Sequence, residues 1–189
     1  MKKRIVALFI FISFSNFYGF GQIEKGNLLI GGSGTINTQR TSTYKYSSIY
    51  LSPTMGIFIS SKLAIGVNLP LSYRNYESSI GTGIGITPYV RYYFLEKEKS
   101  SFFIPFNIGV SNTTFHYPNS TNKPTIYTYT NGSLGIGYTH FITPSVGLEA
   151  SLSYYLEQAK NSIMANPITN SRGLNLYLGL QIYLNRKTK

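Results

Sequence analysis

No cysteine occurs in the sequence, which excludes disulfide bonds, thiolate catalysis and cysteine-ligated metal sites. Charge is also scarce: charged residues make up 12% of the 189 residues, against about 25% in a typical soluble domain. After the first 21 residues, no apolar run approaches the roughly 20 residues of a transmembrane helix. Since only helices and closed barrels satisfy every backbone group in lipid, a chain with little charge and no such helix indicates a β-barrel.

The first 21 residues have the three parts of a secretory signal. Basic residues at positions 2–4 precede an apolar run over 5–14, and Gly19 and Gly21 supply small residues before the expected cleavage point. A membrane-anchor helix is the alternative, but about ten apolar residues are too few for the roughly 20 that span a bilayer. We therefore expect residues 1–21 to be a cleaved signal peptide and residues 22–189 to form one domain.

The clearest strand signal lies over residues 173–184. Side chains alternate between the two faces of a strand, and the apolar ones here all share one face: Leu174, Leu176, Leu178, Leu180, Ile182 and Leu184. This alternation is longer than the usual ~5–6 residues of a globular strand and suits the ~9–11 residues of a tilted strand that crosses a bilayer. The segment is therefore predicted to be a membrane-spanning β-strand.

Seven earlier segments show comparable alternation. The predicted strands are 26–36, 48–59, 63–73, 83–94, 101–115, 125–141, 146–156 and 173–184. Long polar connections alternate with short turns, which is typical of outer-membrane barrels with the loops outside and the turns in the periplasm. The predicted fold is all-β, an eight-stranded antiparallel up-and-down transmembrane β-barrel. Pro53, Pro88 and Pro105 lie inside strands, where a bulge can shift the two faces by one residue.

Alternation alone leaves open which face meets lipid, because a secreted soluble barrel of the lipocalin kind is apolar inside. A water-exposed surface is about a quarter charged or more. By contrast, the polar faces of the third, fourth, seventh and eighth predicted strands carry only Arg91 and Glu149 as charged residues. The small uncharged side chains around them suit a lumen that is filled by its own residues. The apolar face is therefore predicted to face lipid.

Arg91 and Glu149 are the sharpest prediction of the sequence. Each lies about four residues from a short turn, so the two side chains should meet across the lumen near the periplasmic end. An isolated charge there would be costly, since buried ions need a partner. We therefore predict an ion pair that plugs the barrel, together with inward-facing tyrosines that pack in the lumen: Tyr89, Tyr93, Tyr177 and Tyr183.

The chain has a formal net charge of +11, and many of its cations fall in the predicted outward loops. These cations are Arg40, Lys45, Arg74, Lys123, Lys160 and Arg172. They are interpreted either as contacts to lipopolysaccharide phosphates or as ordinary solvated loop charge. Because the charges lie between strands and do not gather on one face, nucleic acid is not expected as a partner.

Three segments resemble a known family. They are Ser-Pro-Thr-Met-Gly-Ile-Phe at 52–58, Leu-Ala-Ile-Gly at 63–66 and Thr-Pro-Tyr-Val-Arg-Tyr-Tyr-Phe at 87–94. They resemble the small, porin-like outer-membrane β-barrel domains of Gram-negative bacteria, and the resemblance implies an eight-stranded barrel related in shape to the OmpA membrane domain. The last strand also looks like the signal read by the barrel-assembly machinery, in the residues Tyr177, Gly179, Ile182 and Leu184.

Few residues favour catalysis, since the chain has two histidines and six acidic residues. Outer-membrane lipid A deacylases use a serine, histidine and acid set on the lipid side. His140 shares the lipid-facing parity, but Glu149 points inward. His116 has no second ligand at metal spacing, and the glycine-rich segments 31–34 and 81–85 lack the following helix of a phosphate cradle. No enzyme activity, metal or cofactor is expected.

Two functions remain for a barrel of this kind in the cell outer membrane. The first is a closed membrane scaffold with surface-exposed interaction loops, because eight strands leave an interior that side chains just fill. The alternative is a narrow porin or channel for small solutes, and a lipid-modifying enzyme is a remote third. The expected partners are outer-membrane lipid and the assembly machinery, and the barrel is expected to be a monomer.

Overall fold

Antiparallel strands make up nearly all of the described chain. The computed structural model describes residues 23–40, 45–118, 124–161 and 167–185, so the predicted signal peptide and Lys123 lie outside the described residues. The strands are β1 (Leu28–Arg40), β2 (Lys45–Ser60), β3 (Leu63–Asn68), β4 (Leu71–Tyr76), β5 (Ser79–Lys97), β6 (Ser100–His116), β7 (Thr125–Thr143), β8 (Val146–Asn161) and β9 (Pro167–Leu184). Among these residues, no helix has the length and apolar character needed to cross a membrane.

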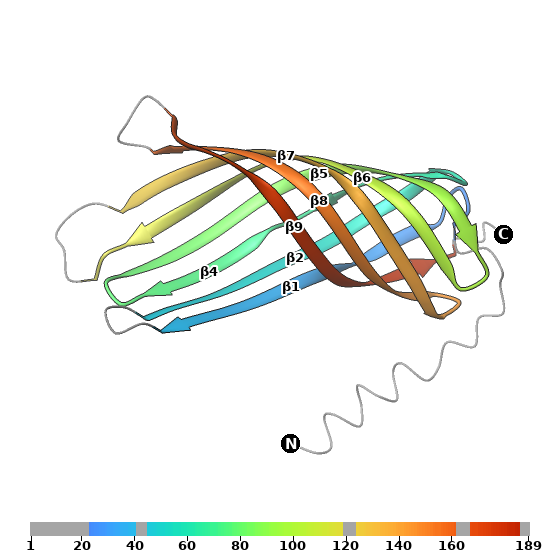
Figure 1. The fold of residues 1–189 in the computed structure, drawn as a ribbon, viewed down its shortest axis with the longest axis horizontal. Coiled ribbons are helices and arrows are strands. Elements are labelled where there is room, and N and C mark those ends of the chain that lie inside the picture. The colour runs from blue at the N-terminus through green and yellow to red at the C-terminus, as the bar shows by residue number, and fades with distance from the viewer. Residues whose placement is uncertain (1–22, 41–44, 119–123, 162–166, 186–189) are drawn as a thin grey trace, which may run out of the picture.

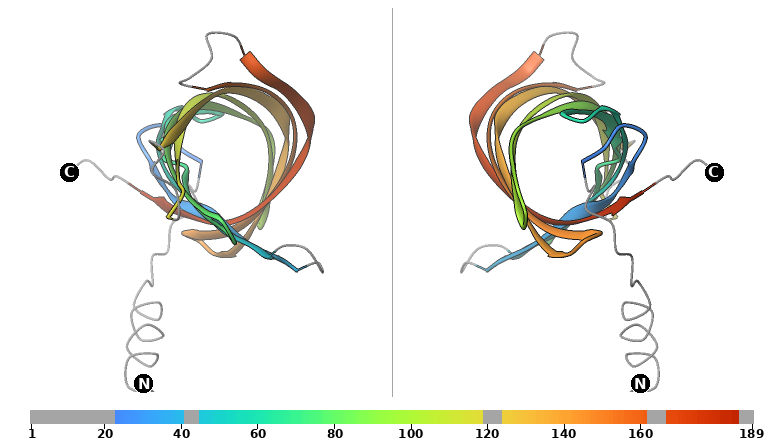
Figure 2. Two further views of the ribbon diagram at one scale, coloured as in Figure 1. Left: turned by 90° about the vertical axis from the view of Figure 1, so that its left-hand side faces the viewer. Right: turned by 90° about the vertical axis from the view of Figure 1, so that its right-hand side faces the viewer.

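The sheet closes on itself, because β1 pairs with β2 on one edge and with β9 on the other. Seen from either end, the strands form a ring (Figure 2). Both β3 and β4 lie between β2 and β5, one after the other, so the nine strands fill eight positions (Figure 1). The predicted all-β, eight-stranded antiparallel barrel is confirmed, with one strand divided in two.

The division falls at Leu69 and Pro70, between β3 and β4. Proline has no N–H to donate to the ladder. The Leu69 N–H donates to the Pro53 carbonyl at 2.9 Å, and the Pro70 carbonyl accepts from the Gly85 N–H at 2.9 Å. The break therefore leaves the hydrogen bonds of the neighbouring strands largely intact.

The prolines within strands do not shift the two faces. The pairs Ile86–Val110 and Tyr89–Asn107 keep the same register on either side of Pro88. Three of the four register shifts lie instead beside the short turns, at Phe58/Ser60, Tyr93/Leu95 and Phe141/Thr143. The predicted inward and outward faces therefore hold through the part of the strands that is predicted to span the membrane.

We call the end with the short turns 61–62, 98–99 and 144–145 the turn end, and the opposite end the loop end. At the loop end, the strands are longer than predicted. The expected loop over 74–82 is wrong: β4 runs to Tyr76 and β5 starts at Ser79, which leaves a two-residue turn. The alternation of inward and outward residues continues there through polar and tyrosine residues. A prediction that relies on alternating apolar residues therefore ends each strand too early.

Pairing between β1 and β9, which we call the seam, covers only part of their length. Residues Leu28–Ser33 pair with Gly179–Leu184 near the turn end. Beyond them, residues 34–40 of β1 and 167–178 of β9 have no pairing with one another. Figure 1 shows the two strands diverging toward the loop end.

Candidate functional site

An ion pair crosses the lumen near the turn end. Arg91 Nη1 donates to Glu149 Oε2 at 2.9 Å and to Oε1 at 3.1 Å. Arg91 lies on β5 and Glu149 on β8, and these strands are separated in the sheet by β6 and β7. The two side chains are only 11% and 7% exposed. The structure thus brings together the two charged residues that the sequence paired.

Both charges have further partners. Glu149 Oε1 accepts from the Tyr183 hydroxyl at 2.9 Å and from Thr139 Oγ1 at 3.2 Å. The Arg91 guanidinium carbon lies 4.9 Å from the ring centroids of both Tyr89 and Phe103, a cation–π distance. A buried ion pair needs such additional contacts, because Coulomb attraction alone barely offsets the loss of hydration.

An aromatic layer surrounds this pair and fills the turn end. The ring centroid of Tyr93 lies 5.2 Å from that of Phe58 and 5.3 Å from that of Phe103, and those of Phe141 and Tyr183 are 5.1 Å apart. These five side chains are at most 5% exposed. Together with the ion pair they form the plug, defined here as Phe58, Tyr89, Arg91, Tyr93, Phe103, Phe141, Glu149 and Tyr183.

Inward-facing glycines make room for the plug rings. A Cβ placed on Gly56 or Gly66 would overlap the Tyr89 ring, and one placed on Gly137 would overlap the Phe103 ring. Each ring therefore occupies the space that a side chain on a neighbouring strand would otherwise take. At this level the glycines leave no gap for a solute, because aromatic rings cover them.

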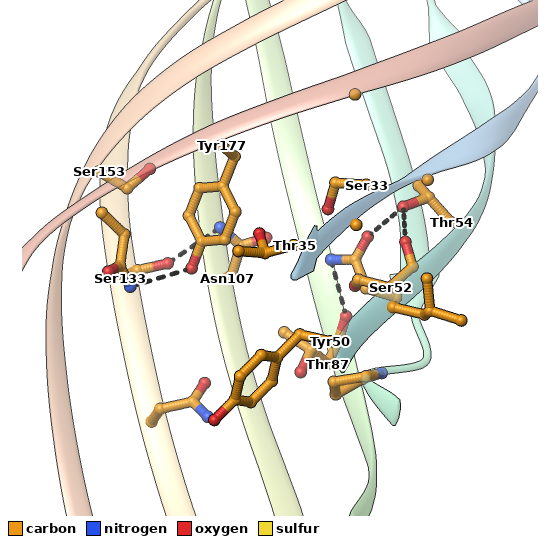
Figure 3. A pocket seen from close by; sticks show the side chains of 18 of the residues that line it. Ser33, Thr35, Tyr50, Ser52, Thr54, Thr87, Asn107, Ser133, Ser153 and Tyr177 are labelled. Atoms are coloured by element: carbon orange, nitrogen blue, oxygen red, sulfur yellow. Dashed lines mark hydrogen bonds between the residues drawn. The ribbon is translucent and has the colours of Figure 1, made fainter. Parts of the chain in front are cut away.

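A cavity of about 590 Å³ lies between the plug and the loop end. Its floor includes Arg91, Phe103 and Glu149. Serine, threonine, asparagine and tyrosine side chains line its walls, and Figure 3 shows several of them, among them Ser33, Thr35 and Tyr177. Tyr177 is 44% exposed. The other three predicted lumen tyrosines, Tyr89, Tyr93 and Tyr183, are at most 3% exposed.

Arg74 faces this cavity from β4, which corrects its predicted place in an outward loop. Its guanidinium carbon lies 5.3 Å from the ring centroid of Tyr50 and 5.9 Å from that of Tyr129. Glu157 of β8 lines the same cavity. Neither residue was assigned to the lumen from the sequence, because the third and seventh strands were predicted to end one residue before Arg74 and Glu157. Extending the alternation by one residue would have identified both.

Comparison with solved structures finds proteins of the same architecture. The chain is similar to the crystal structure of Neisserial surface protein A, with 14% identity, 84% of this chain and 97% of that chain covered, and a TM-score of 0.57. The fold is that of an outer-membrane β-barrel. OprG from Pseudomonas aeruginosa (13% identity; 87% and 99% covered; TM-score 0.52) and a major outer membrane protein from Thermus thermophilus (9%; 84% and 99%; 0.53) share it.

At such low identities, the TM-scores show a shared fold alone, and the resemblance that the sequence suggested is confirmed at that level. No family model matches the chain, and no curated protein sequence matches it.

On this outer-membrane barrel fold, the four residues of the predicted assembly signal all lie on β9. Tyr177 and Gly179 face the lumen, whereas Ile182 and Leu184 lie on the opposite face. Recognition of these four residues by the barrel-assembly machinery stays a prediction. Of the predicted cations, Arg40, Lys45, Lys160 and Arg172 are exposed and lie toward the loop end of their strands.

Both histidines are exposed, His140 on β7 and His116 at the end of β6. His140 is exposed on the outer face of β7, with Nδ1 3.4 Å from the Tyr138 hydroxyl, and Glu149 lies on the inner face of β8. Within the described residues, no group of three or more histidine, cysteine or acidic side chains can hold a metal ion.

Proposed function

We propose that the protein is an integral outer-membrane β-barrel that does not conduct solutes and acts as a membrane scaffold. Its turn end would face the periplasm and its loop end the cell exterior, where the strand ends and connections would present interaction surfaces. The plug is the observation that carries the proposal. A solute passing through the turn end would have to separate Arg91 from Glu149 and displace the aromatic layer, which leaves both charges without partners.

A narrow channel is the alternative, and the cavity of about 590 Å³ favours it. The conductance of purified protein in planar bilayers separates the two functions. We expect no steady open channel from the wild-type barrel, and a measurable conductance from a variant that carries Arg91→Ser, Glu149→Ser, Tyr93→Ser and Phe103→Ser together and so opens both the ion pair and the aromatic layer. Insertion is verified independently by the faster gel migration of the unheated, folded barrel. A steady open channel from the wild-type protein would overturn the scaffold.

We also propose that exposed cations at the loop end attract lipopolysaccharide phosphates. Arg40, Lys45 and Arg172 are exposed there, and a cation near an anionic membrane surface gains about 1 kcal/mol, which salt screens. Neutralising these three residues together should lower the lipopolysaccharide retained during purification, most clearly at low salt. The matched control neutralises Lys62, Lys97 and Lys99, which are exposed at the turn end. Equal retention in both triple variants would dispose of the proposal.

A further inference from the structure

The seam is open over its half nearer the loop end, although the strands on either side of it are well formed. β1 pairs with β2 along its whole length, to the Arg40–Lys45 pair, and β9 pairs with β8 as far as Pro167. The missing pairs are therefore confined to residues 34–40 of β1 and 167–178 of β9. Figure 2 shows β1 and β9 pointing away from one another at this end.

An open strand edge is costly in hydrocarbon, because its N–H and C=O groups find no water there. Part of the free edge of β9 belongs to the lipid-facing stretch: Leu174, Leu176 and Leu178 point outward and are 66%, 68% and 63% exposed. If the barrel spans a membrane as proposed above, this edge must either close against β1 or be occupied by polar groups.

The sequence allows the seam to close without a register shift. Continuing the observed pairs, which end at Ser33–Gly179, places Ile36 opposite Leu176 on the lipid face. The same continuation places Arg40 opposite Arg172 at the outermost position. Like charges directly opposite one another destabilise a strand pair. The seam can therefore form further pairs near the plug, while its outer end is held apart by repulsion.

The open seam connects the lipid face with the cavity. Ser33 and Thr35 of β1 and Asn175 and Tyr177 of β9 line the cavity on its two sides, and Asn175 Nδ2 donates to the Tyr177 hydroxyl at 3.2 Å. Ile36, next to Thr35, is 75% exposed on the opposite face of β1. At the open seam, the outer face of the strands is therefore apolar, and their inner face carries hydroxyl and amide groups. Such a change across one strand suits an amphipathic molecule.

The cavity lining indicates the class of head group. Its four charged residues cancel, since Arg74 and Arg91 are balanced by Glu149 and Glu157, and the remaining polar residues are hydroxyl and amide side chains. Such a lining offers many hydrogen bonds and no net attraction for an ion. Its volume of about 590 Å³ lies within the roughly 300–1,000 Å³ of small-molecule sites.

We propose that the seam is a lateral gate for a single-chain lipid of the outer leaflet with an uncharged, hydroxyl-rich head group, such as glycerol or a sugar. The head group enters the cavity and forms hydrogen bonds with the hydroxyl and amide side chains there. The hydroxyl groups and the ester linkage of the lipid occupy the free edges between β1 and β9, and the acyl chain stays in the surrounding lipid. This inference rests on the proposed membrane location of the barrel.

The gate is tested by locking the seam. The chain has no cysteine and no tryptophan, so Ile36→Cys with Leu176→Cys introduces the only thiols, and Tyr155→Trp adds a single fluorescent reporter that faces the cavity from β8, away from the seam. The matched control places the cysteines at Ile30 and Ile182, which already pair in the closed part of the seam. This pair lies on the same face as Ile36 and Leu176, and it has the same place in the alternation of hydrogen-bonded and non-hydrogen-bonded pairs. The probe is a monoacylglycerol with a brominated dodecanoyl chain, which quenches nearby tryptophan.

We expect saturable quenching in the reduced protein and an intramolecular disulfide on oxidation. Locking the gate should weaken apparent binding by about tenfold or more, because only the open fraction binds. The oxidised control pair should bind the probe as the reduced protein does. A brominated fatty acid or alkyl phosphate at the same mole fraction should bind more weakly than the monoacylglycerol.

Three results would overturn the gate. They are undiminished quenching after intramolecular locking, equal binding of the charged probes, and a disulfide that links two copies of the chain, which would assign the free edges to strand pairing between barrels. Insertion is scored separately by gel migration. A barrel that inserts without binding the probe therefore contradicts the gate alone, whereas a chain that fails to insert contradicts the membrane location.

Discussion

At the scale of single residues, the alternation of inward and outward side chains predicted part of the plug. Arg91 and Glu149 were identified from the sequence because each is a rare charge on an inward face and both lie at a similar distance from a short turn. The contacts of Thr139 and Phe103 with this pair were not identified. Alternation places both residues inside the barrel, but which inward residues touch across the lumen depends on the barrel's diameter and strand tilt.

Removing the Glu149 carboxylate should strongly destabilise the barrel. Glu149→Ala leaves Arg91 buried without its partner, and the expected loss is roughly 3–5 kcal/mol in the free energy of unfolding. Urea unfolding in lipid vesicles measures it. Replacing both partners, with Arg91→Met and Glu149→Leu, should recover most of the loss, because apolar substitutes for a buried pair are often neutral or stabilising. If Glu149→Ala were as stable as the wild type, this would contradict the burial of the ion pair.

Gly137→Ala should disturb the plug, whereas Gly132→Ala on the same strand should not. A Cβ on Gly137 would overlap the Phe103 ring, while one on Gly132 would lie 3.8 Å from its nearest neighbour, the Asn107 carbonyl oxygen. Overpacking of this kind costs about 1–3 kcal/mol. The same unfolding measurement compares the two variants, and equal stabilities would show that Phe103 does not need the space above Gly137.

At the scale of strands, the sequence predicted the faces better than the ends. Six inward-facing and six outward-facing residues repeat without an error in the last strand, and the register of the whole sheet preserves these faces. The division of the third strand at Pro70 was not predicted, because Leu63–Asn68 and Leu71–Tyr76 continue one another with unchanged alternation. The sequence placed the strand ends at the loop end of the barrel too early, because the parts of β-strands that lie outside lipid need no apolar face.

The depth of a lipid-facing residue should decide the cost of a charge there. Ile136 and Ile126 both point outward on β7 and are 50% and 42% exposed, but Ile126 lies ten residues nearer the loop end. Ile136→Arg should cost about 2–4 kcal/mol and Ile126→Arg about 0–1 kcal/mol, as for midplane and interfacial positions. Unfolding in vesicles tests the difference. Similar costs at both positions would contradict the assignment of the apolar band.

At the scale of the whole molecule, the two ends differ in kind. The turn end is filled by the plug, whereas the cavity lies toward the loop end and reaches the open part of the seam. The sequence predicted the ion pair of the turn end, since Arg91 and Glu149 each lie within a few residues of a short turn. The seam was not predicted, because alternation defines the face of each strand but not how far the first strand and the last strand pair.

The proposed location and orientation of this barrel in the outer membrane are tested most directly by labelling single cysteines on intact cells. Ser78 and Ser61 are both exposed serines in two-residue turns, the first at the loop end and the second at the turn end. With no native cysteine in the chain, a membrane-impermeant maleimide should label Ser78→Cys on intact cells. It should label Ser61→Cys only after the outer membrane is permeabilised. Labelling of Ser61→Cys on intact cells, or of neither variant before permeabilisation, would contradict a barrel that crosses the outer membrane with its plugged end in the periplasm.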